Sequence, residues 1–236
     1  MIKAIFFDIF GTLVDWRASL IKNISKSEIF HKNDSFIEQF VINWRLEYQP
    51  ILSKVNKKKI PWMILDDLHL ISLNTVLKKM EVQNITKEQK KELVFLWHKL
   101  EPWEDSIKGL KLLARNYITC SLSNGNISLQ KNLLKYAKLD FNFIFSAENF
   151  KKYKPDLSVY LGAANNLGLV PTECVLVASH KSDLLAANQA GYNTIFIQRE
   201  NEYGDYSEKF KEKPFKPNFT IKSLEDLKKT NYLLVK

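Results

Sequence analysis

Four short stretches of the chain are continuously apolar, and they constrain its fold more than any other feature. They occupy residues 4–7, 118–122, 175–178 and 194–197. A strand that is buried on both faces gives an unbroken apolar run, whereas a strand with one solvated face alternates apolar and polar residues. The four runs therefore predict parallel strands within a sheet that is covered on both faces.

Stretches with a helical period separate these runs. Apolar side chains recur at spacings of three and four in residues 106–113, 129–136, 157–166 and 184–190. Strands that alternate with amphipathic helices are typical of α/β folds, in which the helices cover a parallel sheet. We therefore expect an α/β fold with a doubly wound, mostly parallel sheet and a Rossmann-like core.

One long segment, residues 16–100, breaks this alternation. Its apolar residues, among them Phe40 and Trp44, follow helical periods with no convincing strand between them. Pro102 disfavours helical backbone at the residue before it and marks the end of the segment. We expect an inserted helical cap subdomain at residues 16–100 and a core built from residues 1–15 and 101–236.

The composition narrows the class of protein. With 236 residues and 45% hydrophobic content, the chain can bury a sizeable core without disulfides or metals. It has no run of about eighteen or more apolar residues and no basic leader typical of a secretory signal, so we expect a cytoplasmic protein without a membrane segment. Cys120 and Cys174 lie in apolar runs and are expected to be buried thiols.

The chain carries a net charge of +9, yet only four of its 35 basic residues are arginines. Its longest basic cluster is formed by Lys57, Lys58 and Lys59. Proteins that bind nucleic acids usually gather basic residues on one face, so we expect a solvated lysine-rich surface and no nucleic-acid partner. A positive field would instead speed the arrival of a small anion.

Polar residues follow two of the predicted strands. Asp8 directly follows the first strand and precedes Gly11 and Thr12, and Ser123 and Asn124 come after the second strand. Open α/β sheets bind ligands at the carboxyl ends of their strands, so these side chains are candidates for one shared site. Taken alone, each has a simpler explanation, because such residues are also common in turns where they bond only the backbone.

Two charged residues extend this candidate site. Lys154 precedes the predicted helix at residues 157–166, and Asp183 follows a later strand. A lysine close to Asp8 would lower the pKa of that carboxyl and orient it as a nucleophile, while Asp183 could hold Lys154 or a water molecule. The alternatives are a helix start at Lys154 and Pro155 and a helix-terminal acid at Asp183.

Four ordered motifs carry a family resemblance. They are FFDIFGTL, SLSNG, YKPD followed by Tyr160, and VASHKSD. In this order they resemble the haloacid dehalogenase superfamily over nearly the whole chain. The resemblance implies a nucleophile at Asp8 that is assisted by Lys154, Asp183 and Thr12. It also implies a substrate site that includes Ile9, Phe10, Ser123, Asn124 and Tyr160.

Three positions favour a dehalogenase over a phosphatase of this superfamily. Its phosphatases carry a second aspartate two residues after the nucleophile, where this chain has Phe10. They also carry acids that hold magnesium, where this chain has Ala178 and Ser179. Displacement of a halide from carbon needs no proton for the leaving group, so the missing acid suits that chemistry. We expect no metal and no other cofactor.

The cap carries a second resemblance. The segments FVINWRLEYQP and PWMILDDLHLISL are similar to a subgroup of the type II (S)-2-haloacid dehalogenases, in which Arg45 would match the halide-binding arginine. The resemblance implies that Asp8 displaces halide from a small 2-haloalkanoate and that water hydrolyses the resulting ester to a 2-hydroxy acid. Without this resemblance, Arg45 would be interpreted as a surface ion-pair partner.

One motif departs from the best-known members, which carry serine and asparagine where this chain has Ala178 and His180. His180 could bond a group in the site, act as a base near neutral pH, or cap a loop. Two other functions stay open, a magnesium-dependent phosphatase and a catalytically degenerate binding protein. The candidate partners are a small anionic substrate and a second copy of the chain in a homodimer.

Overall fold

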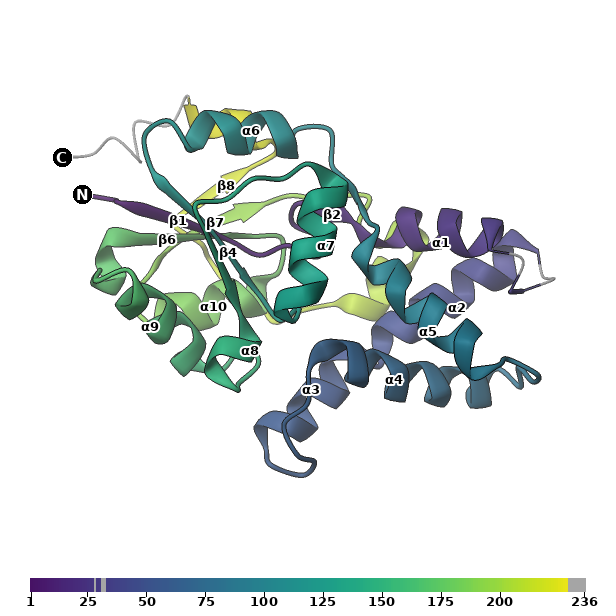
Figure 1. The fold of residues 1–236 in the computed structure, drawn as a ribbon. Helices are drawn as coiled ribbons and strands as arrows, with labels where there is room; N and C mark the ends of the chain where they lie inside the picture. Colours follow the sequence, from purple (N-terminus) through teal and green to yellow (C-terminus); the bar gives the residue numbers. More distant parts are fainter. Residues whose placement is uncertain (28, 31–32, 229–236) are drawn as a thin grey trace.

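A computed structural model describes residues 1–27, 29–30 and 33–228, and its ribbon is drawn in Figure 1. Six strands form one sheet in the order β5-β4-β1-β6-β7-β8, in which every neighbouring pair is parallel. The strands are β1 (Ala4–Phe7), β4 (Ile118–Ser123), β5 (Phe143–Ser146), β6 (Cys174–Ala178), β7 (Asn193–Ile197) and β8 (Phe219–Ile221). The four apolar runs all form strands of this sheet, which confirms the predicted α/β class.

Helices cover both faces of the sheet. Phe7 of β1 packs in the apolar cluster that contains α6 and α7, whereas Phe6 packs in a second cluster with α9 and α10. The helices of the core are α6 (Ser106–Leu113), α7 (Ile127–Ala137), α8 (Ala147–Phe150), α9 (Leu157–Asn166) and α10 (Lys181–Gln189). This two-sided cover explains why the central strands are apolar on both faces.

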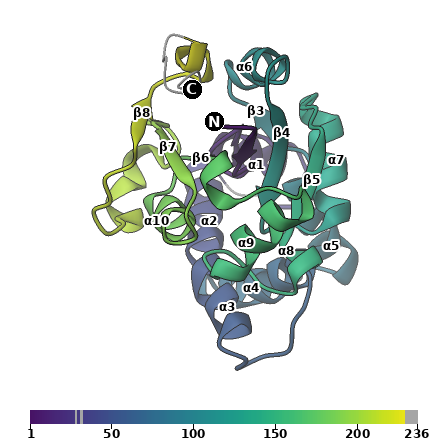
Figure 2. The same ribbon diagram turned by 90° about the vertical axis from the view of Figure 1, so that its left-hand side faces the viewer.

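Two strands that the sequence did not predict, β5 and β8, lie at opposite edges of the sheet. They contain four and three residues. β1 is as short as β5, but all four of its residues are buried, whereas β5 and β8 are partly exposed. The strand order places β4 and β5 on one side of β1 and β6, β7 and β8 on the other, as Figure 2 shows. Such a reversal of strand order is where open α/β sheets bind ligands.

The described part of the inserted segment is helical, as predicted, and Figure 1 shows its helices grouped beside the sheet. They are α1 (Trp16–Lys26), α2 (Asp34–Leu46), α3 (Tyr48–Asn56), α4 (Leu65–Lys79) and α5 (Lys87–Phe95), followed by the short helix η1 (Leu96–His98). Strands β2 (Val14–Asp15) and β3 (Glu101–Pro102) pair in antiparallel fashion at its two ends. The boundaries of the cap at residues 16 and 100 stay a prediction.

Aromatic side chains join the cap to the core. Phe10, in the turn after β1, packs edge to face on Trp97, with 6.0 Å between the ring centres. Trp97 in turn contacts Trp16 of α1 at 6.3 Å and Trp44 of α2 at 5.6 Å. This packing holds α2, which carries Arg45, against the end of β1.

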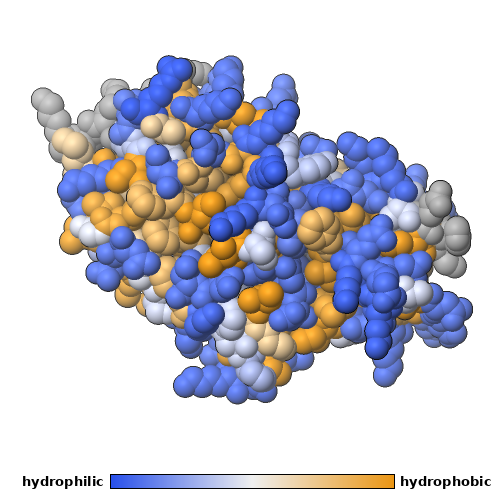
Figure 3. All heavy atoms as spheres, viewed as in Figure 1, coloured by the Kyte–Doolittle hydropathy of each residue, from blue (hydrophilic) through white to orange (hydrophobic). Residues whose placement is uncertain are grey.

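The surface is largely hydrophilic and both cysteines are buried, as the composition and the apolar runs predict. In the face drawn in Figure 3, hydrophilic side chains protrude over core and cap with smaller apolar areas between them. Cys120 and Cys174 are free and buried, and burial raises the pKa of both thiols to about 12. In the part of the chain that the structure describes, no helix is both long and apolar enough to cross a membrane.

Candidate active site

Asp8 is the first residue after β1, and only 6% of it is exposed. The chain then turns sharply, with Gly11 at a φ of +82°, a value that glycine adopts without strain. The Gly11 N–H donates to the Val14 carbonyl at 3.0 Å, and the Thr12 hydroxyl donates to Asp8 Oδ2 at 2.8 Å. The turn therefore presents a carboxylate at the carboxyl end of a central strand with one oxygen already oriented.

Lys154 connects this carboxylate to a second one. Its Nζ donates to Asp8 Oδ1 at 2.9 Å and to Asp183 Oδ2 at 2.5 Å. Asn124 holds the lysine from the end of β4, because its Oδ1 accepts from the Lys154 N–H at 2.8 Å. Asp183 lies in the first turn of α10, and the Tyr160 hydroxyl donates to its other oxygen. One buried ammonium group thus bridges two carboxylates that follow different strands.

Burial and neighbouring charges compete at these groups. Burial alone would raise the pKa of Asp8, but the charge of Lys154 and a hydrogen bond with His180 lower that pKa well below its usual range. Burial raises the pKa of Asp183, and the charge of Lys154 only partly offsets this. Burial would lower the pKa of Lys154, but Asp183 and Asp8 raise it instead. Asp8 is therefore ionised at neutral pH, as a nucleophile requires.

A small pocket of about 40 Å³ opens onto Asp8. That volume holds roughly three water molecules. Its walls come from both core and cap and include Phe10, Arg45, Tyr48, Gln49, Asn124, Lys154, His180 and Asp183. The pocket therefore offers a nucleophile together with several positive charges to a ligand of a few atoms.

Arg45 is buried in the cap wall of this pocket, with 9% of the residue exposed. Its guanidinium carbon lies 4.3 Å from the ring centre of Tyr48 and 5.3 Å from that of Trp16. Within the described residues it has no ion pair or hydrogen bond, so the surface ion pair considered from the sequence is not formed. A buried, stacked guanidinium with free donors is suited to binding an anion.

Three residues expected at the substrate site, Ile9, Ser123 and Tyr160, are not among the residues that line this pocket, and their contact with a substrate stays a prediction. The hydroxyl of Ser123 accepts from the Gly125 N–H at 3.1 Å. The side chain of Ile9 is fully buried in the apolar core, and Tyr160 is occupied by its bond to Asp183. Ser123 therefore contributes to the site through its loop, and Tyr160 through Asp183, which does line the pocket.

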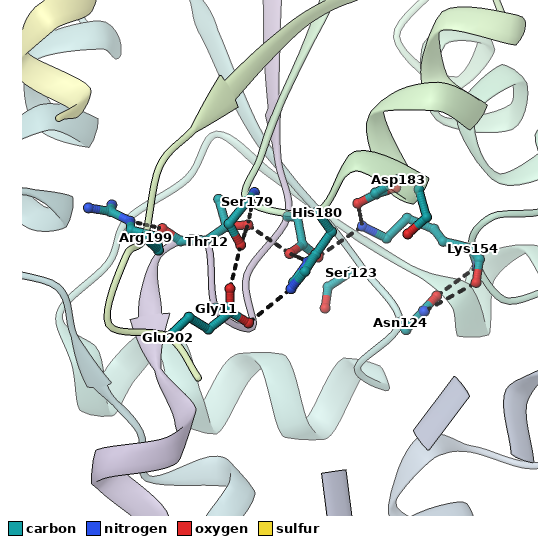
Figure 4. A network of polar contacts seen from close by, with 12 residues as sticks. Gly11, Thr12, Ser123, Asn124, Lys154, Ser179, His180, Asp183, Arg199 and Glu202 are labelled. Atoms are coloured by element: carbon teal, nitrogen blue, oxygen red, sulfur yellow. Dashed lines mark hydrogen bonds and ion pairs between the residues drawn. The ribbon is translucent and has the colours of Figure 1, made fainter. Parts of the chain in front are cut away.

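His180 and Glu202 complete the site. The sequence indicated His180 as a candidate but not Glu202. His180 precedes α10, and its Nδ1 lies 3.4 Å from Asp8 Oδ2. Figure 4 shows its ring between the loop after β6 and Glu202. Glu202 was missed because it sits in the polar stretch RENEYGD, which is typical of a surface loop. The only available signal was its position shortly after a predicted strand.

The described acidic residues around the pocket are not grouped as metal ligands. Among the residues that the structure describes, no three His, Cys, Asp or Glu side chains are grouped as metal ligands. Asp8 and Asp183 both bond Lys154, and Ser179 donates to Glu202 at 3.1 Å. An ionised carboxylate held beside a small, positively lined pocket has the properties of a nucleophile for a small anion.

Known proteins are similar to this chain in sequence and in fold. Residues 2–191 match the family model of the haloacid dehalogenase-like hydrolases. The chain is 29% identical over 211 residues to (S)-2-haloacid dehalogenase 4A of Burkholderia cepacia, a match that covers 87% of each chain.

Two solved structures are similar over almost their whole length. One is the L-2-haloacid dehalogenase PA0810, with a TM-score of 0.90, 34% sequence identity and coverage of 97% of this chain and 99% of that chain. The other is the defluorinating L-2-haloacid dehalogenase Rha0230, with a TM-score of 0.88, 34% identity and coverage of 96% and 93%.

Proposed function

The chain belongs to the haloacid dehalogenase-like hydrolases, and on that premise we propose that it hydrolyses a small 2-haloacid to a 2-hydroxy acid through an ester on Asp8. One observation carries the proposal. An ionised, oriented Asp8 and an Arg45 guanidinium that has no ion-pair partner among the described residues line the same small pocket. The names of the similar proteins, which are 2-haloacid dehalogenases, support the same substrate class.

The first step is a displacement at carbon. A carboxylate oxygen of Asp8 attacks the α-carbon, a C–O bond forms, and the C–halogen bond breaks with its electron pair on the halide. No proton is needed for this leaving group, and Arg45 can stabilise the negative charge that develops on it. Water then attacks the carboxyl carbon of Asp8 and releases the hydroxy acid. In-line attack inverts the α-carbon, so an (S)-haloacid gives an (R)-hydroxy acid.

The proposal needs no metal ion. Lys154 Nζ supplies a positive charge beside Asp8 and Asp183, the carboxylates that would hold a magnesium ion in a phosphatase. Phe10 is packed against Trp97 at the position of the phosphatase acid, and Ala178 and Ser179 offer no carboxylate. A magnesium-dependent phosphatase and a degenerate binding protein have less support, since neither accounts for Arg45 facing an ionised Asp8.

A substrate panel tests the function. We expect halide release from chloroacetate, fluoroacetate and (S)-2-chloropropionate that is unchanged by EDTA, with (R)-lactate formed from the last. Turnover of phosphomonoesters alone, and only with magnesium, would replace the proposal by the phosphatase; binding of haloacids without turnover would favour the degenerate protein.

Arg45→Met is expected to lower halide release by about 10²-fold while changing the melting temperature little, because the guanidinium acts on the departing halide. The methionine can still pack against Tyr48 and Trp16. Arg115→Met, which removes an exposed arginine, is the matched control and should behave as wild type. Lost stability with unchanged kinetics in Arg45→Met would mean that Arg45 has only a packing role.

A further inference from the structure

Glu202 is a carboxylate in the interior, with 1% of the residue exposed. It lies in the loop after β7 and accepts three side-chain hydrogen bonds. The donors are Trp16 Nε1 at 3.0 Å, Ser179 Oγ at 3.1 Å and His180 Nε2 at 2.9 Å. Burial would raise the pKa of Glu202, but the charge of His180, together with Arg45 and the hydrogen bond from Trp16, lowers it below its usual value.

The loop that carries the nucleophile is built around Glu202. A Cβ added at Gly11 would lie 2.0 Å from Glu202 Oε1, so no other residue type fits there without moving the carboxylate. Ser179 also connects Glu202 to the nucleophile loop. Its hydroxyl donates to Glu202, and its N–H donates to Thr12 Oγ1 at 2.9 Å. Glu202 is therefore positioned relative to Asp8 by its close contact with Gly11 and by the hydrogen bonds through Ser179 and Thr12. The two carboxylates do not bond each other directly.

His180 is held by this carboxylate in a defined orientation. A carboxylate only accepts hydrogen bonds, so His180 Nε2 must carry a proton and donate it to Glu202. When the ring is neutral, its lone pair is then on Nδ1, the atom that lies 3.4 Å from Asp8 Oδ2. The acceptor atom of the ring therefore faces the nucleophile, as Figure 4 shows for the ring and its bond to Glu202.

We propose that Glu202 is a positioning residue that holds His180 so that its Nδ1 removes the proton from the water that hydrolyses the ester on Asp8. This inference rests on the proposed function, because without an aspartyl ester there is nothing to hydrolyse. Asp183 is the competing base, but both of its oxygens already accept hydrogen bonds, from Lys154 and Tyr160.

The protons balance over the cycle. Ester formation removes the negative charge of Asp8, so His180 gives its second proton to solvent and becomes neutral. Water attacks the ester carbon and passes a proton to Nδ1, and the imidazolium then protonates the departing alkoxide to give the hydroxy acid. The new carboxylic acid of Asp8 returns its proton to His180. One halide ion and one proton leave in each cycle.

The charges around His180 agree with this sequence of states. Burial would lower the pKa of His180, but Glu202 and the hydrogen bond to Asp8 raise it well above 6.5 in the free enzyme. Esterification removes the contribution of Asp8, so the pKa falls and the ring can act as a base. The ionisable groups that face His180 or share its pocket are Asp8, Arg45, Lys154, Asp183, Glu202 and Tyr203.

Single-turnover kinetics of Glu202→Gln test the proposal. With enzyme in excess over chloroacetate, halide release reports ester formation, and intact-protein mass spectrometry follows the ester. We expect ester formation close to the wild-type rate and ester hydrolysis slowed by about 10–100-fold, the usual effect of losing a group that orients a catalytic residue. The acid limb of the hydrolysis profile should move to lower pH, because losing the Glu202 charge lowers the pKa of His180.

Two further variants make the result decisive. His180→Gln should also accumulate the ester, and adding Glu202→Gln to it should have no further effect. Glu212→Gln is the matched control, since Glu212 accepts from the Lys181 and Ser182 N–H groups at the start of the same helix without touching His180. It should leave both rates unchanged. If Glu202→Gln fails to fold, ester accumulation in His180→Gln still decides whether the ring is the base.

The failures are distinguishable. Hydrolysis and its pH profile unchanged in folded Glu202→Gln, or additive effects in the double variant, would overturn the role of Glu202 while the dehalogenase function stands. No ester and no halide from the wild-type enzyme would overturn the proposed function itself.

Discussion

Asp8→Asn is expected to lower halide release by roughly 10⁴-fold or more, because it removes the nucleophile rather than a contact around it. The amide is nearly isosteric and its oxygen can still accept from Thr12, so the melting temperature should change little. Halide release from saturating chloroacetate measures the effect. The mass of the purified variant must be checked, since conversion of the asparagine to aspartate would restore activity.

Heavy-oxygen water separates a nucleophilic Asp8 from an Asp8 that acts as a base. With enzyme in excess over haloacid, hydrolysis at the carboxyl carbon should put the label on the peptide that contains Asp8 and leave the first-turnover product unlabelled. Label found only in the product would mean that water attacks the substrate directly. Asp8 would then lose its role as nucleophile, and His180 and Asp183 would become candidates for activating that water.

Lys154→Met is expected to lower turnover by about 10³-fold, because it removes the charge that orients and ionises Asp8. Asp8 and Asp183 would both lose the ammonium group that bridges them, which raises the pKa of at least one of these buried carboxyls. Whatever activity remains should therefore increase toward higher pH, since a raised pKa of Asp8 delays its ionisation. The pH dependence of halide release measures both effects.

Stability decides how this variant is interpreted. Removal of one partner from a buried ion pair costs roughly 3–5 kcal/mol, so melting curves must accompany the kinetics. Lys152→Met, which removes a partly exposed lysine paired with Asp156, is the control and should cost at most about 1 kcal/mol. Near-normal turnover in folded Lys154→Met would show that Asp8 is activated without this lysine.

Much of the fold was predictable because burial leaves a local trace in sequence. Each of the four central strands is apolar on both faces, and the period of residues 106–113 and 157–166 matches α6 and α9 to the residue. The edge strands β5 and β8 gave no such trace, because each is only partly buried. Residues 16–100 showed a helical period, which identified the cap but not its placement on the core.

The candidate site was predictable only in part. Asp8, Thr12, Asn124, Lys154 and Asp183 were indicated by their positions at strand and helix ends, and the structure brings all five together. Three further residues, Ile9, Ser123 and Tyr160, were expected at the substrate site but do not line the pocket, so their contact with a substrate stays a prediction. A position after a strand predicts the edge of the sheet on which a residue lies, not the direction in which its side chain points.

The sequence by itself determined the strands, the helices and the edge of the sheet at which the chemistry gathers, because hydrophobic period and strand ends are local properties. Only the tertiary structure decided which side chains bond one another in the site. Lys154 reaches Asp8 across 146 positions, and Trp16 reaches Glu202 across 186. Such contacts depend on β4, β1, β6 and β7 lying side by side and on the cap packing over them. That arrangement follows from the packing of the whole chain, which no local pattern encodes.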